Sequence, residues 1–112
     1  MSSTNIRKIQ LHKQELDEKY LSRKLTEITE NTPTIIQNLN QYKKKFNVRD
    51  NSKLLIHEKA LIKILLINRR TLNLIIGQNL ICYMDLFGLR IYSVKDIQNF
   101  MLLIKKKVIF TK

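Results

Sequence analysis

The amino-acid sequence predicts a mostly helical protein with a short two-stranded β element near its carboxyl-terminal end. The chain has two glycines and one proline in 112 residues, too few for the many turns of an all-β sandwich. Hydrophobic residues make up 44% of the chain, and long stretches repeat them every three or four residues, the spacing of one helix face. Leucine and isoleucine dominate and tryptophan is absent, so we expect an aliphatic core.

A polar segment without hydrophobic periodicity, residues 47–53, is a predicted linker that divides the chain into two parts. Residues 1–53 form an N-terminal helical arm with this linker, and residues 54–112 form a second domain. Within the arm, the apolar spacing predicts one helix over residues 5–30 and another over residues 33–46.

Thr32 is expected to cap the second helix, and Pro33 to take its first position, where a missing N–H is tolerated. A stripe of large apolar side chains follows both helices: Leu21, Leu25, Ile28, Ile35, Leu39, Tyr42 and Phe46. The stripe predicts a contact with another helix, either within the chain or in a homodimer formed through the N-terminal helices. Lys43, Lys44 and Lys45 then end the second helix, where they suit the helix dipole or could touch phosphate.

Two short helices with a brief connection are expected at the start of the second domain. The first covers residues 58–66 and the second residues 69–78, with Asn68 as its N-cap. Leu72, Ile75 and Ile76 would be buried. Two helices joined so closely predict a helix-turn-helix unit.

The last third of the chain predicts a hairpin followed by a helix. Two β-prone segments, residues 80–84 and 89–93, flank a turn at residues 85–88. Ser93 and Asp96 have the spacing of a capping box, with aspartate in place of glutamate. They begin a helix that buries Ile97, Phe100, Met101 and Ile104. The basic and then apolar end is expected to be a frayed tail or a short strand.

The net charge of +12, from 21 basic and 9 acidic residues, predicts attraction to DNA, RNA or an anionic membrane surface. The alternative is a charge that only keeps the protein soluble. A single cysteine, Cys82, indicates a reducing cytoplasmic setting, and its apolar neighbours predict a buried, inert thiol. No secretory signal and no membrane-spanning segment of ~18 apolar residues is expected.

Nothing in the sequence indicates an enzyme. His12 and His57 stand far apart without a cysteine and acid arranged around them, and Gly77 and Gly88 form no phosphate-binding loop. No residues have the spacing of metal ligands. We therefore expect no catalytic residue, no metal and no cofactor.

The residues at the start of the second short helix suit the DNA major groove. Arginine bonds guanine and asparagine bonds adenine bidentately, so Asn68, Arg69, Arg70, Thr71 and Asn73 are candidates for contact. The alternative is an ordinary solvated first turn. Arginines are slightly unfavourable beside a helix N-terminus, which supports a binding role.

Two motifs carry a resemblance to a known family. Ile67-Asn68-Arg69-Arg70-Thr71-Leu72 is followed by the run GLRIYSVKDIQNF that ends at Phe100. In this order they resemble the excisionase and MerR-like winged helix-turn-helix family, over residues 54–104. The sequence departs from that pattern where the family has a turn glycine, here Leu66, a glycine after the recognition helix, here Asn79, and a wing-opening proline, here Cys82.

The resemblance implies a mostly α winged helix-turn-helix with an N-terminal helical arm and a short two-stranded wing. It implies that Arg70, Thr71 and Asn73 face DNA and that Arg90 and Tyr92 belong to the wing. The predicted nucleic-acid-binding residues are Asn68, Arg69, Arg70, Thr71, Asn73, Arg90, Tyr92 and Lys95.

The predicted function is sequence-specific binding of double-stranded DNA, as an excisionase-like or transcription-regulatory protein of a mobile element. The alternative is an RNA-binding structural protein, such as a small ribosomal or mitochondrial ribosomal component in contact with structured RNA and ribosomal proteins. A third class is a helical interaction protein that uses the N-terminal stripe. The wing motif discriminates, because ribosomal binding does not require it.

Overall fold

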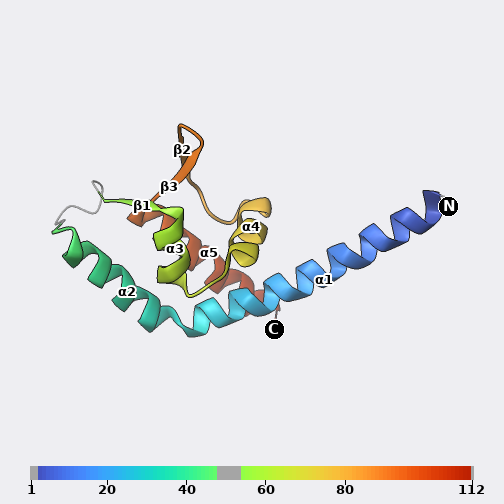
Figure 1. Ribbon diagram of the computed structural model, residues 1–112. Helices are drawn as coiled ribbons and strands as arrows, with labels where there is room; N and C mark the ends of the chain where they lie inside the picture. The colour runs from blue at the N-terminus through green and yellow to red at the C-terminus, as the bar shows by residue number, and fades with distance from the viewer. Residues whose placement is uncertain (1–2, 48–53, 112) are drawn as a thin grey trace.

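The computed structural model shows a mostly helical chain with a small three-stranded antiparallel sheet (Figure 1). It describes residues 3–47 and 54–111, with the surroundings of the side chains of residues 16–47 and 54–107. The elements in chain order are α1 (Ser3–Glu30), α2 (Thr32–Lys45), β1 (Leu55–His57), α3 (Glu58–Leu65), α4 (Arg69–Gly77), β2 (Met84–Leu86), β3 (Leu89–Ser93) and α5 (Val94–Thr111). The expected fold class is thus confirmed as mostly helical with a small sheet.

Both predicted N-terminal helices are present, but the corner between them is built differently from the expectation. The N-cap of α2 is Asn31, not Thr32. The Thr32 hydroxyl instead donates to the carbonyl oxygen of Thr29, 2.7 Å away. Pro33 is the second residue of α2 and not the first, but it still lies in the first turn, where its missing N–H leaves no helical hydrogen bond unmade. The predicted linker lies largely outside the described residues, since residues 48–53 are not among them.

The apolar stripe of the two N-terminal helices packs within the chain at most of its positions. Its buried members are Leu21, Leu25, Ile28, Ile35 and Leu39, and they join one hydrophobic cluster with residues of α3, α4, α5 and the sheet. Tyr42 is only partly buried, and Phe46 is 52% exposed. The five buried positions cannot serve as a dimer surface while they are covered by the same chain.

The connection between α3 and α4 closes one helix and opens the next within three residues. Leu66 adopts the left-handed conformation, with φ of 59°. The Ile67 N–H then donates to the Ile62 carbonyl oxygen at 3.1 Å, a bond that ends many helices. Asn68 caps α4 as predicted, because its side chain accepts from the Thr71 N–H at 2.8 Å.

The amino end of α3 has a cap that the sequence did not suggest. His57 Nδ1 accepts a hydrogen bond from the Lys59 backbone N–H at 3.2 Å. His57 also ends β1, so one residue closes a strand and opens a helix. Histidine is an uncommon N-cap, and for this reason the sequence rules did not identify it.

The sheet contains a strand that the sequence did not predict. β1 pairs antiparallel with β3, with Ile56 opposite Tyr92. β2 pairs with the other edge of β3, so the strand order is β1-β3-β2. Three residues are too few to show a period of two, and the partner of β1 lies more than 30 residues further along the chain.

The hairpin forms, but its first strand starts later than expected. Residues 80–83 are not in a strand, because Leu80 and Ile81 are buried at the end of α4. The two-residue turn Phe87-Gly88 has positive φ at both positions, 54° and 83°, as a tight hairpin turn requires. It sets Leu86 opposite Leu89 and so confines β2 to Met84–Leu86.

Cys82 is exposed, which corrects the expectation of a buried thiol. The neighbouring apolar residues suggested burial, but Leu80 and Ile81 take the core positions before it. The chain then leaves the core, and Tyr83 and Met84 are exposed beside it. Adjacent apolar residues in an irregular segment therefore do not share one environment.

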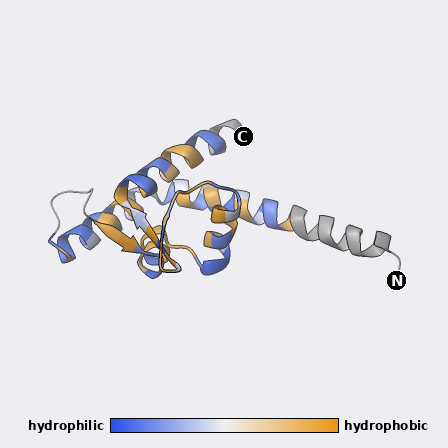
Figure 2. Ribbon diagram, turned by 90° about the horizontal axis from the view of Figure 1, so that it is seen from above, coloured by the Kyte–Doolittle hydropathy of each residue, from blue (hydrophilic) through white to orange (hydrophobic). Residues whose placement is uncertain are grey.

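The last helix, α5, begins at the predicted capping box. The Ser93 N–H donates to Asp96 Oδ2, and the Asp96 N–H donates to Ser93 Oγ, both at 3.0 Å. Ile97, Phe100 and Ile104 are buried, and α5 packs against α1. The basic and apolar end is helical through Thr111 rather than a frayed tail or strand. Figure 2 shows hydrophilic and hydrophobic residues alternating along α5, as a helix with one buried face requires.

The left-handed residue between α3 and α4 gives a test of the backbone. A glycine at position 66 has no Cβ to crowd the following carbonyl, whereas alanine keeps the cost of about 1–2 kcal/mol. Glycine also makes the unfolded chain more flexible, and this entropy lowers the stability of the glycine variant by about 0.4–1 kcal/mol. We therefore expect Leu66→Gly to have the larger free energy of unfolding, by about 0.5–1 kcal/mol over Leu66→Ala, in urea denaturation.

The same pair of substitutions at the exposed helical position Gln98 is the control. There alanine should be the more stable variant, by about 0.8–1 kcal/mol. If the alanine variant were more stable than the glycine variant at position 66 as well, residue 66 would not be left-handed.

Candidate nucleic-acid interface

The N-cap and the first two turns of α4 present four of the predicted binding residues at the surface. Asn68, Arg69, Arg70 and Asn73 are all exposed. Thr71, in the first of these turns, is fully buried. The two turns therefore offer two guanidinium groups and the Asn73 amide to a partner.

The buried carboxylate of Glu58 connects α4 to the hairpin. Arg69 Nη1 donates to Glu58 Oε1 at 2.6 Å, and Arg90 Nη1 lies 3.6 Å from the same oxygen. Glu58 is only 7% exposed, and a buried carboxylate is stable only when paired. Glu58 thus brings an arginine of α4 and an arginine of β3 to one point.

Glu58 was not among the residues predicted from the sequence. A signal for it was present, because it is the one acidic residue between Asp50 and Asp85. An isolated acid in a basic stretch, at the first position of a helix, suits both the helix dipole and pairing with nearby arginines.

Arg70 is held by α1 rather than by its own helix. Its Nη2 donates to Asp17 Oδ1 at 3.1 Å. Its guanidinium carbon lies 4.1 Å from the centroid of the Tyr20 ring, a cation–π contact. The side chain is nevertheless 59% exposed, so it remains accessible to a ligand.

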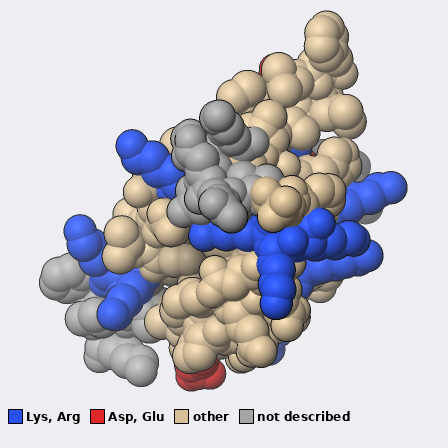
Figure 3. Space-filling view, turned by 90° about the vertical axis from the view of Figure 1, so that its left-hand side faces the viewer, with Lys and Arg blue, Asp and Glu red and all other residues tan. Residues whose placement is uncertain are grey.

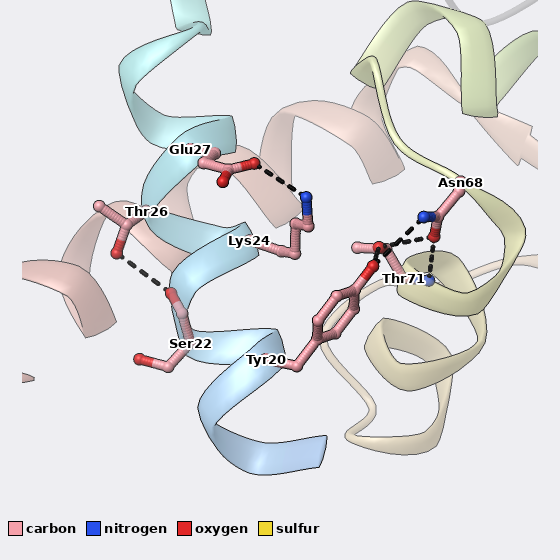
Figure 4. A network of polar contacts seen from close by, with 7 residues as sticks. All are labelled: Tyr20, Ser22, Lys24, Thr26, Glu27, Asn68 and Thr71. Carbon is pink, nitrogen blue, oxygen red and sulfur yellow. Dashed lines mark hydrogen bonds and ion pairs between the residues drawn. The ribbon is translucent and has the colours of Figure 1, made fainter. Parts of the chain in front are cut away.

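Tyr20 also fixes the two polar residues that begin α4 (Figure 4). Its hydroxyl is 3.0 Å from Thr71 Oγ1 and accepts from Asn68 Nδ2 at 3.2 Å. Asn68 Oδ1 accepts from the Thr71 hydroxyl at 2.8 Å, which closes a triangle of side chains. The hydrogen bonds with Thr71, and then with Asn68, lower the pKa of Tyr20 below its ordinary value.

Two predicted binding residues are buried, so the structure places them away from a ligand. Thr71 lies under Tyr20, and Tyr92 is on the inner face of the sheet with no exposed surface. The Tyr92 hydroxyl has no hydrogen-bond partner among the described residues. Burial first, and the nearby Glu58 carboxylate second, raise the pKa of Tyr92 to about 12. Both residues support the site from within.

Arg90 and Lys95, the remaining predicted residues, lie on separate elements. Arg90 is in β3, half-buried, with its guanidinium carbon 5.5 Å from the centroid of the exposed Tyr83 ring. Its strand partner is Asp85. Lys95 is exposed in the first turn of α5, and no contact joins it to Arg69 or Arg90.

A hollow of about 470 Å³ lies between the hairpin and the amino ends of α3 and α4. Arg69, Arg90 and Lys59 line it together with Glu58 and Asp85. The positive and negative groups nearly balance here, so the hollow alone is not a strong anion site.

Two further findings concern the part of the chain that the structure describes. No group of three or more histidine, cysteine, aspartate or glutamate side chains is placed to hold a metal ion there. None of the helices within the described ranges has the length and hydrophobicity needed to cross a membrane.

The buried Tyr92 hydroxyl leads to a test of the core beneath the site. Because this hydroxyl is buried without a partner, Tyr92→Phe should keep or increase the free energy of unfolding at pH 7. The folded state holds the phenolic proton more tightly than the unfolded chain. The stability linked to it is therefore complete below pH ~10 and lost as the pH rises through about 12.

Urea denaturation between pH 8 and pH ~11 measures this difference. The wild type should lose more stability over that range than Tyr92→Phe, and the exposed-ring variant Tyr83→Phe should follow the wild type. If all three proteins lost the same free energy of unfolding over this range, ionisation of Tyr92 would not be coupled to unfolding.

Comparisons with known protein-family models, with curated proteins and with solved structures found no match to this chain. The family resemblance therefore rests on the motifs that end at Leu72 and at Phe100 alone.

Proposed function

We propose that this protein binds double-stranded DNA sequence-specifically, as an excisionase-like or transcription-regulatory protein of a mobile element. In this proposal α3 and α4 act as a helix-turn-helix, and the β2–β3 hairpin acts as the wing of a winged helix-turn-helix. The function is binding without catalysis: α4 enters the major groove, and the hairpin contacts the adjacent backbone.

The observation that carries the proposal is the convergence of Arg69 and Arg90 on Glu58. DNA-binding proteins place cationic side chains from adjacent elements next to neighbouring phosphates of the duplex. Arg69 begins the candidate recognition helix, and Arg90 lies in the candidate wing. The Glu58 carboxylate holds both arginines at a fixed separation before any ligand arrives.

The side chains proposed to touch DNA are fewer than the sequence suggested. Arg70 and Asn73 are exposed on α4 and suit base edges, whereas Arg69 and Arg90 suit phosphates. Lys95 would add a phosphate contact from α5. Asn68, Thr71 and Tyr92 would act indirectly, because the first two orient α4 through Tyr20 and the third packs under the hairpin.

The competing function is an RNA-binding structural protein, which the net charge of +12 fits equally well. Fluorescence anisotropy separates the two. Labelled duplex DNA from a selected random pool and a structured RNA hairpin of equal length are titrated across a salt series. Tighter binding of the RNA, or no DNA binding at ~100 mM salt, would contradict the proposal.

Substitution of Arg70 tests its role on the candidate recognition helix. Loss of a bidentate contact to a base costs about 1–3 kcal/mol, so Arg70→Ala should weaken binding to the selected duplex by about 5–150-fold. The effect on an unrelated duplex should be much smaller. The charge-matched control is Lys106→Ala, at an exposed position on α5. Equal losses in the two variants would exclude α4 as the reading helix.

Asp17 gives an independent test, because it holds the same arginine from α1. A ligand must compete with this carboxylate for the Arg70 guanidinium. Asp17→Asn should therefore bind DNA more tightly than Glu18→Gln, which removes the same charge at the neighbouring exposed position. An exposed ion pair contributes up to about 1 kcal/mol, so the difference should be about two- to fivefold. If the two variants bound DNA with the same affinity in anisotropy titrations, Asp17 and the DNA would not compete for Arg70.

A further inference from the structure

We propose that a groove between α2 and α3 binds the phosphate backbone of the same DNA duplex, beyond the part met by α4 and the hairpin. This inference rests on the proposed function and extends its interface to the N-terminal helices. It assigns a binding role to Lys45 and Lys63.

The groove has a volume of about 620 Å³ and is lined with cationic, amide and apolar side chains. Its cations are Lys45 from α2 and Lys59 and Lys63 from α3. Asn38 and Gln41 add amide groups. Among the described residues that line it there is no carboxylate. Figure 3 shows lysine and arginine side chains spread over this side of the molecule, below the projecting hairpin.

The groove differs from the hollow under the hairpin in how its charges are balanced. The hollow contains Glu58 and Asp85 beside its arginines. The ion pairs found among the described side chains include none of Lys45, Lys59 and Lys63. Their positive charge is therefore available to an external anion. A partner with several phosphates gains most from it, through release of counterions.

The groove is held at a fixed width by contacts between its two walls. Asn38 Nδ2 donates to the Ile64 carbonyl oxygen at 3.2 Å, a direct bond from α2 to α3. Ile35 and Leu39 of α2 are buried in the common hydrophobic cluster. Lys59 and Lys63 are four residues apart on α3 and so share one face of that helix. The two helices that carry the lysines are thus held in a fixed position relative to each other.

The groove is continuous with the candidate DNA site. His57 and Lys59 line both the groove and the hollow that contains Arg69 and Arg90. A path of cations therefore runs from Lys45 and Lys63, past Lys59, to the arginines at the start of α4 and in β3. A duplex strand repeats its charge about every 3.4 Å along the axis.

The test compares two charge-matched double variants in the full chain. Lys45→Gln/Lys63→Gln removes the two lysines that line the groove but not the hollow. Lys105→Gln/Lys106→Gln removes two exposed lysines of α5, which line neither. All four lysines are exposed, and thermal unfolding verifies that both variants fold.

Anisotropy titrations use duplexes of about 10 and about 20 base pairs, one and two helical turns, over a series of salt concentrations. Each phosphate contact contributes about −0.9 to the slope of log K against log salt. On the longer duplex, the groove variant should have a slope about 1.8 units shallower than the wild type, and the α5 variant about the same slope as the wild type. On the shorter duplex, the groove variant should bind nearly as the wild type does.

The outcomes separate this inference from the proposed function. If the wild type binds no duplex, the proposed function fails, and the groove proposal fails with it. If the wild type binds duplex but both double variants lose the same slope, the groove is overturned while DNA binding stands. A groove variant that loses RNA hairpin binding but no duplex affinity would also overturn it, in favour of RNA as the occupant.

Discussion

The buried carboxylate of Glu58 is the contact on which the arrangement of α3, α4 and the hairpin depends. It stands at the first position of α3, and two arginines reach it from α4 and β3. Removing one partner of a buried ion pair typically costs about 3–5 kcal/mol, because the other charge is left uncompensated. Arg69 and Arg90 are partly exposed, so solvent reduces that cost here. The pairing nevertheless fixes which way the start of α4 faces relative to the hairpin.

A second constraint comes from the N-terminal helices, which are part of the same core. Leu21, Leu25 and Ile28 of α1 are buried against the rest of the chain, and Tyr20 fastens the first turn of α4 through Asn68 and Thr71. The position of the candidate recognition helix is therefore set from both sides, by α1 and by Glu58. The arm is better understood as a support for α4 than as an appended element. The contact with Tyr20 also explains why Thr71, in an exposed turn, has no exposed surface.

Sequence reasoning succeeded where structure is determined by neighbouring residues. Asn68 and the Ser93–Asp96 capping box were identified to the residue, because a cap acts over three positions. It failed where the partner is distant. β1 has three residues and pairs with a strand far along the chain, and the burial of Thr71 depends on Tyr20, 51 residues earlier. Tyr92 belongs to a recognised motif, but a motif does not state which face of a strand points inward. The structure shows that Arg69 and Arg70 are exposed, as a surface site requires. Their contact with DNA is the proposal made above.

The two carboxylates that hold the arginines would act differently when a phosphate approaches. An arginine has five N–H donors, and Glu58 engages Arg69 through Nη1. The remaining donors of Arg69 stay free for a phosphate, so this pair can persist in a complex and keeps the guanidinium oriented. Asp17 engages Arg70 through Nη2, so a bidentate contact of both Nη groups with a base would have to displace this carboxylate. That contact must be exchanged rather than shared. In the proposed interface, Glu58 thus contributes preorganisation, whereas Asp17 sets a threshold that an incorrect sequence, offering no bidentate partner, does not overcome.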